Sequence, residues 1–127
     1  MKINNERNIT LGEFLKEKRT QSGFTLRKFA ELLSISPAHM SDIENDHRNP
    51  SEAILNKMIL LLKLDEIETY ELYDLAAANK LKNNVVSLDL SKYIMGTENL
   101  RIDLRKAKDQ KINDKQWEEI IKIIEKI

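Results

Sequence analysis

The sequence contains no cysteine, and only three glycines and two prolines among its 127 residues. The absence of cysteine excludes disulfides, thiolate zinc sites and cysteine nucleophiles. No apolar run approaches the roughly 20 residues that span a bilayer, and the polar first eight residues lack the apolar core of a signal peptide. With 41% hydrophobic and 33% charged residues, we expect a folded, helix-rich protein of the reducing cytoplasm without a membrane partner.

A surplus of basic charge, the usual signature of nucleic-acid binding, is also missing, because 21 basic residues balance 21 acidic ones. The charges are unevenly spread, however. One short stretch without Lys or Arg holds five acidic residues, namely Asp65, Glu66, Glu68, Glu71 and Asp74. The remainder of the chain therefore carries a positive excess, and the neutral total weakens the case for a DNA partner without excluding it.

Capping signals predict three short helices in the first part of the chain. Thr10 and Glu13 have the spacing of a capping box, which predicts a helix over about residues 10–22. Thr25 can cap a second helix over residues 26–33. Ser36 followed by Pro37 predicts a third helix to about residue 45, because proline lacks only an N–H that the first turn leaves unpaired anyway. Two short helices joined by a tight turn are typical of the helix-turn-helix motif.

Further helices are predicted in the rest of the chain. Ser51 and Asp65 can cap helices that run to about residues 62 and 78. The pattern then fades into a linker, where Val85, Val86 and Leu88 favour a brief extended piece. Beyond it, helices are expected over about residues 90–95, over residues 97–110, and from the capping pattern of Asn113 and Gln116 to the end. We therefore expect one domain over residues 1–79 and a helical C-terminal extension over residues 80–127.

Residues Thr25 to Ser51, TLRKFAELLSISPAHMSDIENDHRNPS, resemble the lambda-repressor-like (Xre/Cro) family of helix-turn-helix transcriptional regulators. The positions that match the family pattern are Thr25, Ala30, Leu33, Ser36, Ser41, Ile43, Glu44, Arg48, Asn49, Pro50 and Ser51. The resemblance implies an all-α fold, a five-helix DNA-binding domain followed by the extension. It also implies a structural ion pair between Arg19 and Glu44, and double-stranded DNA as the partner.

The outward residues of the third helix are the candidates for reading bases. Met40 and Ile43 have the spacing of inward anchors, so that a small, polar first turn remains to enter a major groove about 12 Å wide. The outward residues are Pro37, Ala38, His39, Ser41 and Asp42. By resemblance, Ala38, His39 and Asp42 lie at the family's base-reading positions. Asp42 could accept a hydrogen bond from cytosine N4 or exclude wrong sites by repulsion.

A second group of residues is expected at the phosphate backbone. The group comprises Thr25, Arg27, Lys28, Asn45, His47, Arg48 and Asn49. Arg27 and Lys28 place positive charge in the first turn of a helix, against the macrodipole, and a phosphate would offset that cost. The alternative is two solvated surface charges. The equal alternative for Asn45 and Asn49 is turn formation, which is the commoner role of Asn at such positions.

Three departures from the family pattern weaken the transfer of backbone contacts. Ser34 replaces a frequent turn glycine, Asp46 replaces a frequent glycine after the recognition helix, and Leu26 stands where many members carry a phosphate-binding Gln. The two histidines, His39 and His47, have no metal-ligand spacing. No nucleophile–base set or phosphate-cradling glycine loop is present, so we expect no catalysis and no cofactor.

The leading hypothesis is a dimeric, sequence-specific repressor that occludes a promoter. The apolar stripe of the last helix, Trp117, Ile120, Ile121, Ile124 and Ile127, favours dimerisation over packing on the domain core. The competing hypothesis is an antitoxin or phage-type interaction protein, whose C-terminal half binds a protein partner such as a toxin or an anti-repressor. Neutral net charge and the apolar tail favour this alternative somewhat.

Overall fold

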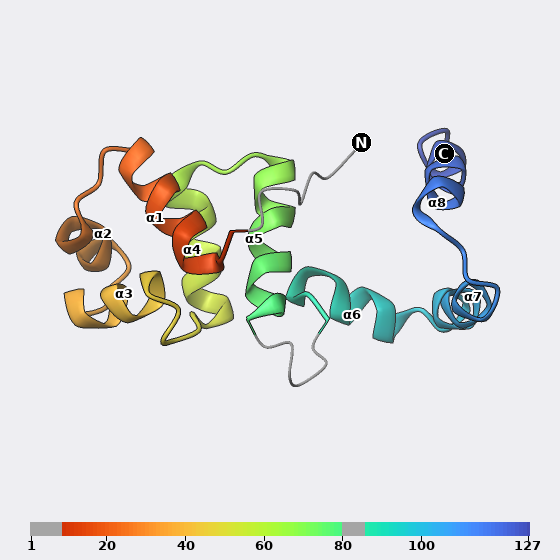
Figure 1. Cartoon of the computed structure of the whole chain (residues 1–127), viewed down its shortest axis with the longest axis horizontal. Helices are drawn as coiled ribbons and strands as arrows, with labels where there is room; N and C mark the ends of the chain where they lie inside the picture. Colours follow the sequence, from red (N-terminus) through yellow and green to blue (C-terminus); the bar gives the residue numbers. More distant parts are fainter. Residues whose placement is uncertain (1–8, 80–85) are drawn as a thin grey trace. The chain divides into compact units, whose positions relative to one another are not determined.

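The computed structural model describes residues 9–79 and 86–127, which form helices joined by short connections and contain no strand (Figure 1). The predicted all-helical fold class is confirmed. The chain divides into two compact units, Met1–Asp89 and Leu90–Ile127. The predicted domain boundary at residues 79–80 stays a prediction, because residues 80–85 lie outside the described ranges. None of the described helices combines the length and apolar composition needed to cross a bilayer.

The first unit begins with the three predicted helices. These are α1 (Leu11–Gln21), α2 (Leu26–Leu32) and α3 (Pro37–Glu44). The hydroxyls of Thr10, Thr25 and Ser36 each accept a hydrogen bond from the backbone N–H three residues on, at 3.1, 3.1 and 3.0 Å. The predicted capping box at Thr10 forms only in half, because the Glu13 carboxylate accepts from the Thr10 hydroxyl at 3.3 Å instead of from its backbone N–H.

Two longer helices complete this unit. Ser51 caps α4 (Glu52–Leu62), accepting from the Ile54 N–H at 3.3 Å. A full capping box opens α5 (Glu66–Ala78), where the Glu68 N–H donates to Asp65 at 2.8 Å and the Asp65 N–H donates to Glu68 at 3.0 Å. Both helix starts agree with the prediction, although the reciprocal role of Glu68 was not foreseen.

A single apolar core joins all five helices. Met40 and Ile43, the predicted inward anchors of α3, are completely shielded from solvent. The buried apolar residues are Leu11, Phe14, Leu15, Phe29, Ala30, Leu33, Met40, Ile43, Leu55, Met58, Leu62, Leu72 and Ala76. Each helix contributes at least two of them, so burial of apolar surface favours all five helices together.

Helix α1 approaches the end of α3 unusually closely at Gly12. A Cβ atom built on Gly12 would lie 2.2 Å from the Glu44 carbonyl oxygen, far inside van der Waals contact. The Gly12 N–H donates to the Asp46 carboxylate at 2.9 Å. The absence of a side chain at residue 12 therefore allows the backbone of α1 to touch the backbone that ends α3.

The second unit contains the remaining helices. They are α6 (Leu88–Gly96), whose first residues belong to the first unit, α7 (Glu98–Asp109) and α8 (Asp114–Ile124). The predicted capping box of Asn113 and Gln116 is present, with N–H···O distances of 2.9 and 3.0 Å. The predicted extended piece is wrong at Leu88, which starts α6 because its side chain packs on the core of the first unit. Val86 belongs to no strand, and Val85 lies outside the described ranges.

An ion pair between α1 and α5 makes stability depend on pH. The Lys18 ammonium donates to Glu68, and this hydrogen bond is the main cause that lowers the pKa of Glu68 below its usual value of 4.5. The stabilisation is therefore complete above about pH 4.5, the unfolded-state value, and is lost as pH falls through the lower folded-state value.

In Glu68→Gln the capping acceptor remains but the charge is gone. The melting temperature should be lower than that of the native chain at pH 7, and this gap should close on acidification. A gap that stayed constant from pH 7 to pH 3 would contradict the prediction.

Gly12→Ala should destabilise the first unit by about 1–3 kcal/mol or more, because the new methyl group must push the end of α3 away. Urea unfolding followed by circular dichroism would measure the change. Gly96→Ala is the matched control, since a Cβ at residue 96, in a helix, meets no atom within 4 Å. That variant should be neutral or slightly more stable. Equal effects at the two glycines would mean that the close approach at Gly12 has no energetic consequence.

Candidate nucleic-acid interface

Helices α2 and α3 form the helix-turn-helix pair and lie next to each other in the first unit (Figure 1). The connecting turn closes through the Ile35 N–H, which donates to the Ala30 carbonyl at 3.0 Å. Ser34 lies in this turn with φ of 59°. This is the left-handed region, which disfavours residues with a Cβ by about 1–2 kcal/mol. The serine at a frequent family glycine position therefore keeps the backbone conformation that glycine would adopt.

The predicted ion pair between α1 and α3 is confirmed. The Arg19 guanidinium donates to both oxygens of the Glu44 carboxylate, at 2.6 and 3.1 Å, and also to the Phe24 carbonyl at 2.8 Å. The side chains of Arg19 and Glu44 are only 9% and 5% exposed. A two-pronged contact of this kind fixes direction as well as distance. The pair therefore sets the angle at which α3 leaves the core.

Asp46 anchors the loop that follows α3. Its φ is 61°, again left-handed, and its carboxylate accepts the hydrogen bond from the Gly12 N–H near the start of α1. A carboxylate at the N-terminus of a helix is favourable because of the helix dipole. The His47 N–H then donates to the Asp42 carbonyl at 2.9 Å. Sequence reasoning noted Asp46 only as a departure from glycine, and it missed both this role and Gly12.

The five predicted base-reading residues all lie on α3. Pro37, Ala38 and Asp42 are exposed, whereas His39 and Ser41 are half-buried. The Nε2 atom of His39 is shielded from solvent and has no hydrogen-bond partner in the described chain. A base contact from this ring would therefore use Nδ1 or require a rotation of the side chain. The Ser41 hydroxyl accepts from the Asn45 amide at 3.3 Å.

The seven predicted phosphate-binding residues are all exposed. They lie at the start of α2 (Thr25, Arg27 and Lys28) and after α3 (Asn45, His47, Arg48 and Asn49). Within the described ranges, the three cations Arg27, Lys28 and Arg48 form no ion pair. The two asparagines have structural roles, since Asn45 ends α3 and Asn49 accepts from the Asn79 amide of the α5 C-cap at 3.1 Å. Asn45 thus has the turn-forming role, whereas Asn49 joins the loop after α3 to the end of α5.

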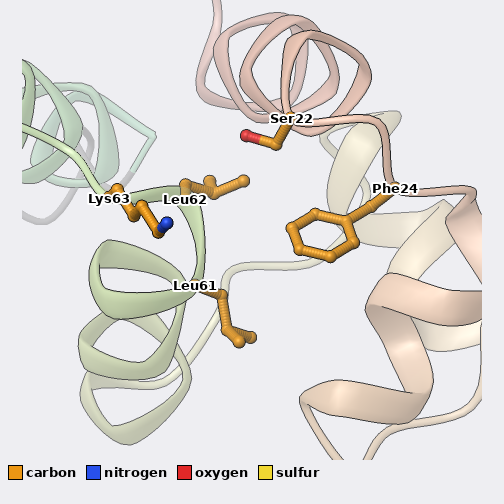
Figure 2. A pocket seen from close by; sticks show the side chains of 5 residues that line it. All are labelled: Ser22, Phe24, Leu61, Leu62 and Lys63. Atoms are coloured by element: carbon orange, nitrogen blue, oxygen red, sulfur yellow. The ribbon is translucent and has the colours of Figure 1, made fainter.

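A pocket of about 240 Å³ opens between the turn after α1 and the end of α4. Figure 2 shows the Phe24 ring facing Leu61 and Leu62 across it, with Ser22 and Lys63 at its edge. None of the predicted DNA-binding residues lines this pocket. In the part of the chain that is described, no group of three or more His, Asp or Glu side chains is placed to hold a metal ion.

Comparison with known proteins gives matches in the same region. The family model described as helix-turn-helix matches residues 15–68. The HTH-type transcriptional regulator ImmR of Bacillus subtilis (strain 168) is 38% identical over 50 residues, which is 39% of either chain. The ImmF control region 10 kDa protein of Bacillus phage phi105 is 34% identical over 55 residues, 43% of this chain and 61% of that protein.

The chain thus spans less than two thirds of the length of either relative. No solved structure matches it significantly. The matched residues contain α2 and α3, the Arg19–Glu44 pair and the Asp46 anchor. Residues 15–68 of this chain are therefore similar to the helix-turn-helix family, in the segment that contains α2 and α3.

Proposed function

We propose that this chain is a sequence-specific, DNA-binding transcriptional regulator that works as a dimeric repressor by occluding a promoter. The observation that carries the proposal is the exposed pair of helix starts at α2 and α3, held by the buried Arg19–Glu44 contact. Three cations, Arg27, Lys28 and Arg48, flank this pair and form no ion pair with any described residue. The first unit would bind double-stranded DNA, and residues 80–127 would supply the contact between protomers.

Affinity in this proposal comes from the phosphate backbone. Contacts to phosphates give binding energy without sequence information. The proposed contacts come from Thr25, Arg27, Lys28, Asn45, His47, Arg48 and Asn49. Arg27 and Lys28 lie in the first turn of α2, which contains no acidic residue. A phosphate at this position would offset both their mutual repulsion and their unfavourable interaction with the helix dipole.

Specificity is assigned to the exposed face of α3, comprising Pro37, Ala38, His39, Ser41 and Asp42. In a dimer, two such faces about 34–36 Å apart would read successive major grooves of a palindromic operator. The rigid base of α3 supports this role, because a recognition helix distinguishes base pairs only when its position is fixed. Arg19, Gly12 and Asp46 are positioning residues in this account.

A second candidate function is an interaction protein whose C-terminal half binds a protein partner such as a toxin or an anti-repressor. The observation in its favour is the exposed apolar surface of the second unit, where Tyr93, Met95 and Ile124 are each more than half exposed. One of the relatives is named for a phage control region. DNA binding would be secondary in this case.

Fluorescence anisotropy with duplexes from the protein's own upstream region would test the leading proposal. The native duplex should bind more tightly than a scrambled one, with affinity falling as salt rises. Lys28→Ala should weaken binding to both duplexes and reduce the salt slope by about 1. Lys57→Ala, an exposed lysine on α4, is the control and should change neither quantity. Equal, weak binding to both duplexes would favour the interaction protein.

Asp42→Ala tests the reading of bases separately from affinity. If the carboxylate accepts a hydrogen bond from cytosine N4, the variant should lose about 1–3 kcal/mol of discrimination at one base pair. Total affinity for nonspecific DNA should rise slightly, because one negative charge leaves the phosphate-facing surface. Titrations against a set of single-site operator variants would measure both effects. Unchanged affinity together with unchanged base preference would make Asp42 a solvated helix position.

A further inference from the structure

The second unit has no interior of its own. It comprises residues Leu90–Ile127, and none of its residues is buried. Units below about 40 residues usually need a disulfide, a metal or association with another chain to be stable. The sequence contains no cysteine, and the described residues offer no metal-holding group. Association with a second copy of the chain is one means of covering this unit.

Helix α8 carries an apolar surface that is largely exposed to solvent. At 100° per residue, its apolar residues occupy one continuous face and its charged residues the other. The apolar residues are Trp117, Ile120, Ile121, Ile123, Ile124 and, in the turn that follows, Ile127. Trp117 and Ile120 are already half-buried within the unit. Ile123, Ile124 and Ile127 remain 65%, 59% and 102% exposed, and they lie together toward the C-terminal end.

The charges beside this face indicate which surface fits it. Glu119 and Lys126 are seven residues apart, so they lie on the same edge of the helix, two turns from each other. The last turn continues along the helix, since the Lys126 N–H donates to the Ile123 carbonyl at 3.2 Å. Ile123 lies midway between the two charges. An antiparallel second copy of α8, centred at Ile123, would place each Glu119 within one residue, about 1.5 Å along the helix, of the level of the other copy's Lys126.

The same register also matches the apolar residues. With Ile123 on the two-fold axis the two Ile123 side chains meet, and Ile120 of one copy lies within one residue, about 1.5 Å along the helix, of the level of Ile127 of the other. A parallel arrangement would instead stack Glu119 on Glu119 and Lys126 on Lys126. Glu119 already accepts from Lys122 at 3.2 Å, in a pair whose side chains are 66% and 72% exposed. Lys126 of the second copy would be a second cation beside the Glu119 carboxylate, at the rim of the contact.

We propose that α8 packs antiparallel against α8 of a second copy of this chain, with Ile123 on the two-fold axis and Glu119–Lys126 pairs at both rims. The inference deepens the proposed function, since it assigns the dimer contact on which that function rests. It names the surface and its orientation, and it is independent of which operator is bound.

Single cysteines provide a direct test of the orientation, because the native chain has none. Ile123→Cys in the full chain should give a disulfide-linked dimer under mild oxidation, since a disulfide needs Cα atoms roughly 4.4–6.8 Å apart. Ile127→Cys should remain unlinked under the same conditions, because its neighbour across the contact is Ile120. Non-reducing electrophoresis would show both results. Linking through residue 127 but not 123 would overturn the antiparallel register, and linking through neither would overturn the contact.

Light scattering on the DNA-free protein tests the same surface without oxidation. Ile123→Asp should raise the dissociation constant of the dimer at least ~100-fold, because two carboxylates would be buried together at the axis. Leu60→Asp is the control, since Leu60 is 77% exposed on α4 and lies in the first unit, and it should leave the dimer intact. Glu119→Lys and Lys126→Glu should each weaken the dimer, and the double variant should restore it.

The outcomes separate this inference from the proposed function. A native chain that is monomeric without DNA, yet binds its operator specifically, would overturn the α8 contact and leave the regulator intact. A dimer that is lost in Ile123→Asp, from a chain that shows no DNA preference, would support the contact and overturn the regulator. Circular dichroism of each variant would confirm that the first unit is still folded.

Discussion

The Arg19 guanidinium donates to both oxygens of the Glu44 carboxylate and to the Phe24 carbonyl from a site that solvent barely reaches. Removing two charges from water is expensive, and the cost is recovered only when the geometry is good and the remaining donors have partners. The contact therefore holds α1, the turn after it and the end of α3 in one arrangement. The position of α3, the closing turn before it and the loop behind it all depend on that arrangement.

The two units of the chain differ in how completely they bury their own apolar residues. Among the described residues, the first unit buries thirteen apolar side chains, whereas the second buries none. The second unit nevertheless contains a full helix-capping box, formed by Asn113 and Gln116 at the start of α8. Local signals are thus sufficient to begin the helices of the second unit without burial of its apolar residues. This division is consistent with a DNA-binding unit and a separate unit for association.

The neutral net charge is reconciled with the proposed function by where the charges lie. The acidic stretch forms α5, and part of it is used within the fold, as Glu68 both caps the helix and pairs with Lys18. The cations at the start of α2 and after α3 form no ion pairs within the described ranges. A phosphate surface responds to the local field within about a Debye length, which is about 8 Å at physiological salt. The sum over the whole chain is therefore a poor guide to what this end of the unit binds.

The sequence by itself determined most of the helices and their caps, because these depend on residues within four positions of each other. Thr25, Ser36 and Ser51 were read correctly for that reason. The tertiary structure alone decided features that join distant residues. Gly12 is hydrogen-bonded to Asp46, 34 positions away in the sequence, and Asn49 to Asn79, 30 positions away. No periodic pattern in the sequence predicts such contacts. Packing likewise decided that the His39 Nε2 atom is shielded from solvent and that the apolar face of α8 is exposed. Exposure depends on which surfaces come together and not on the residue type.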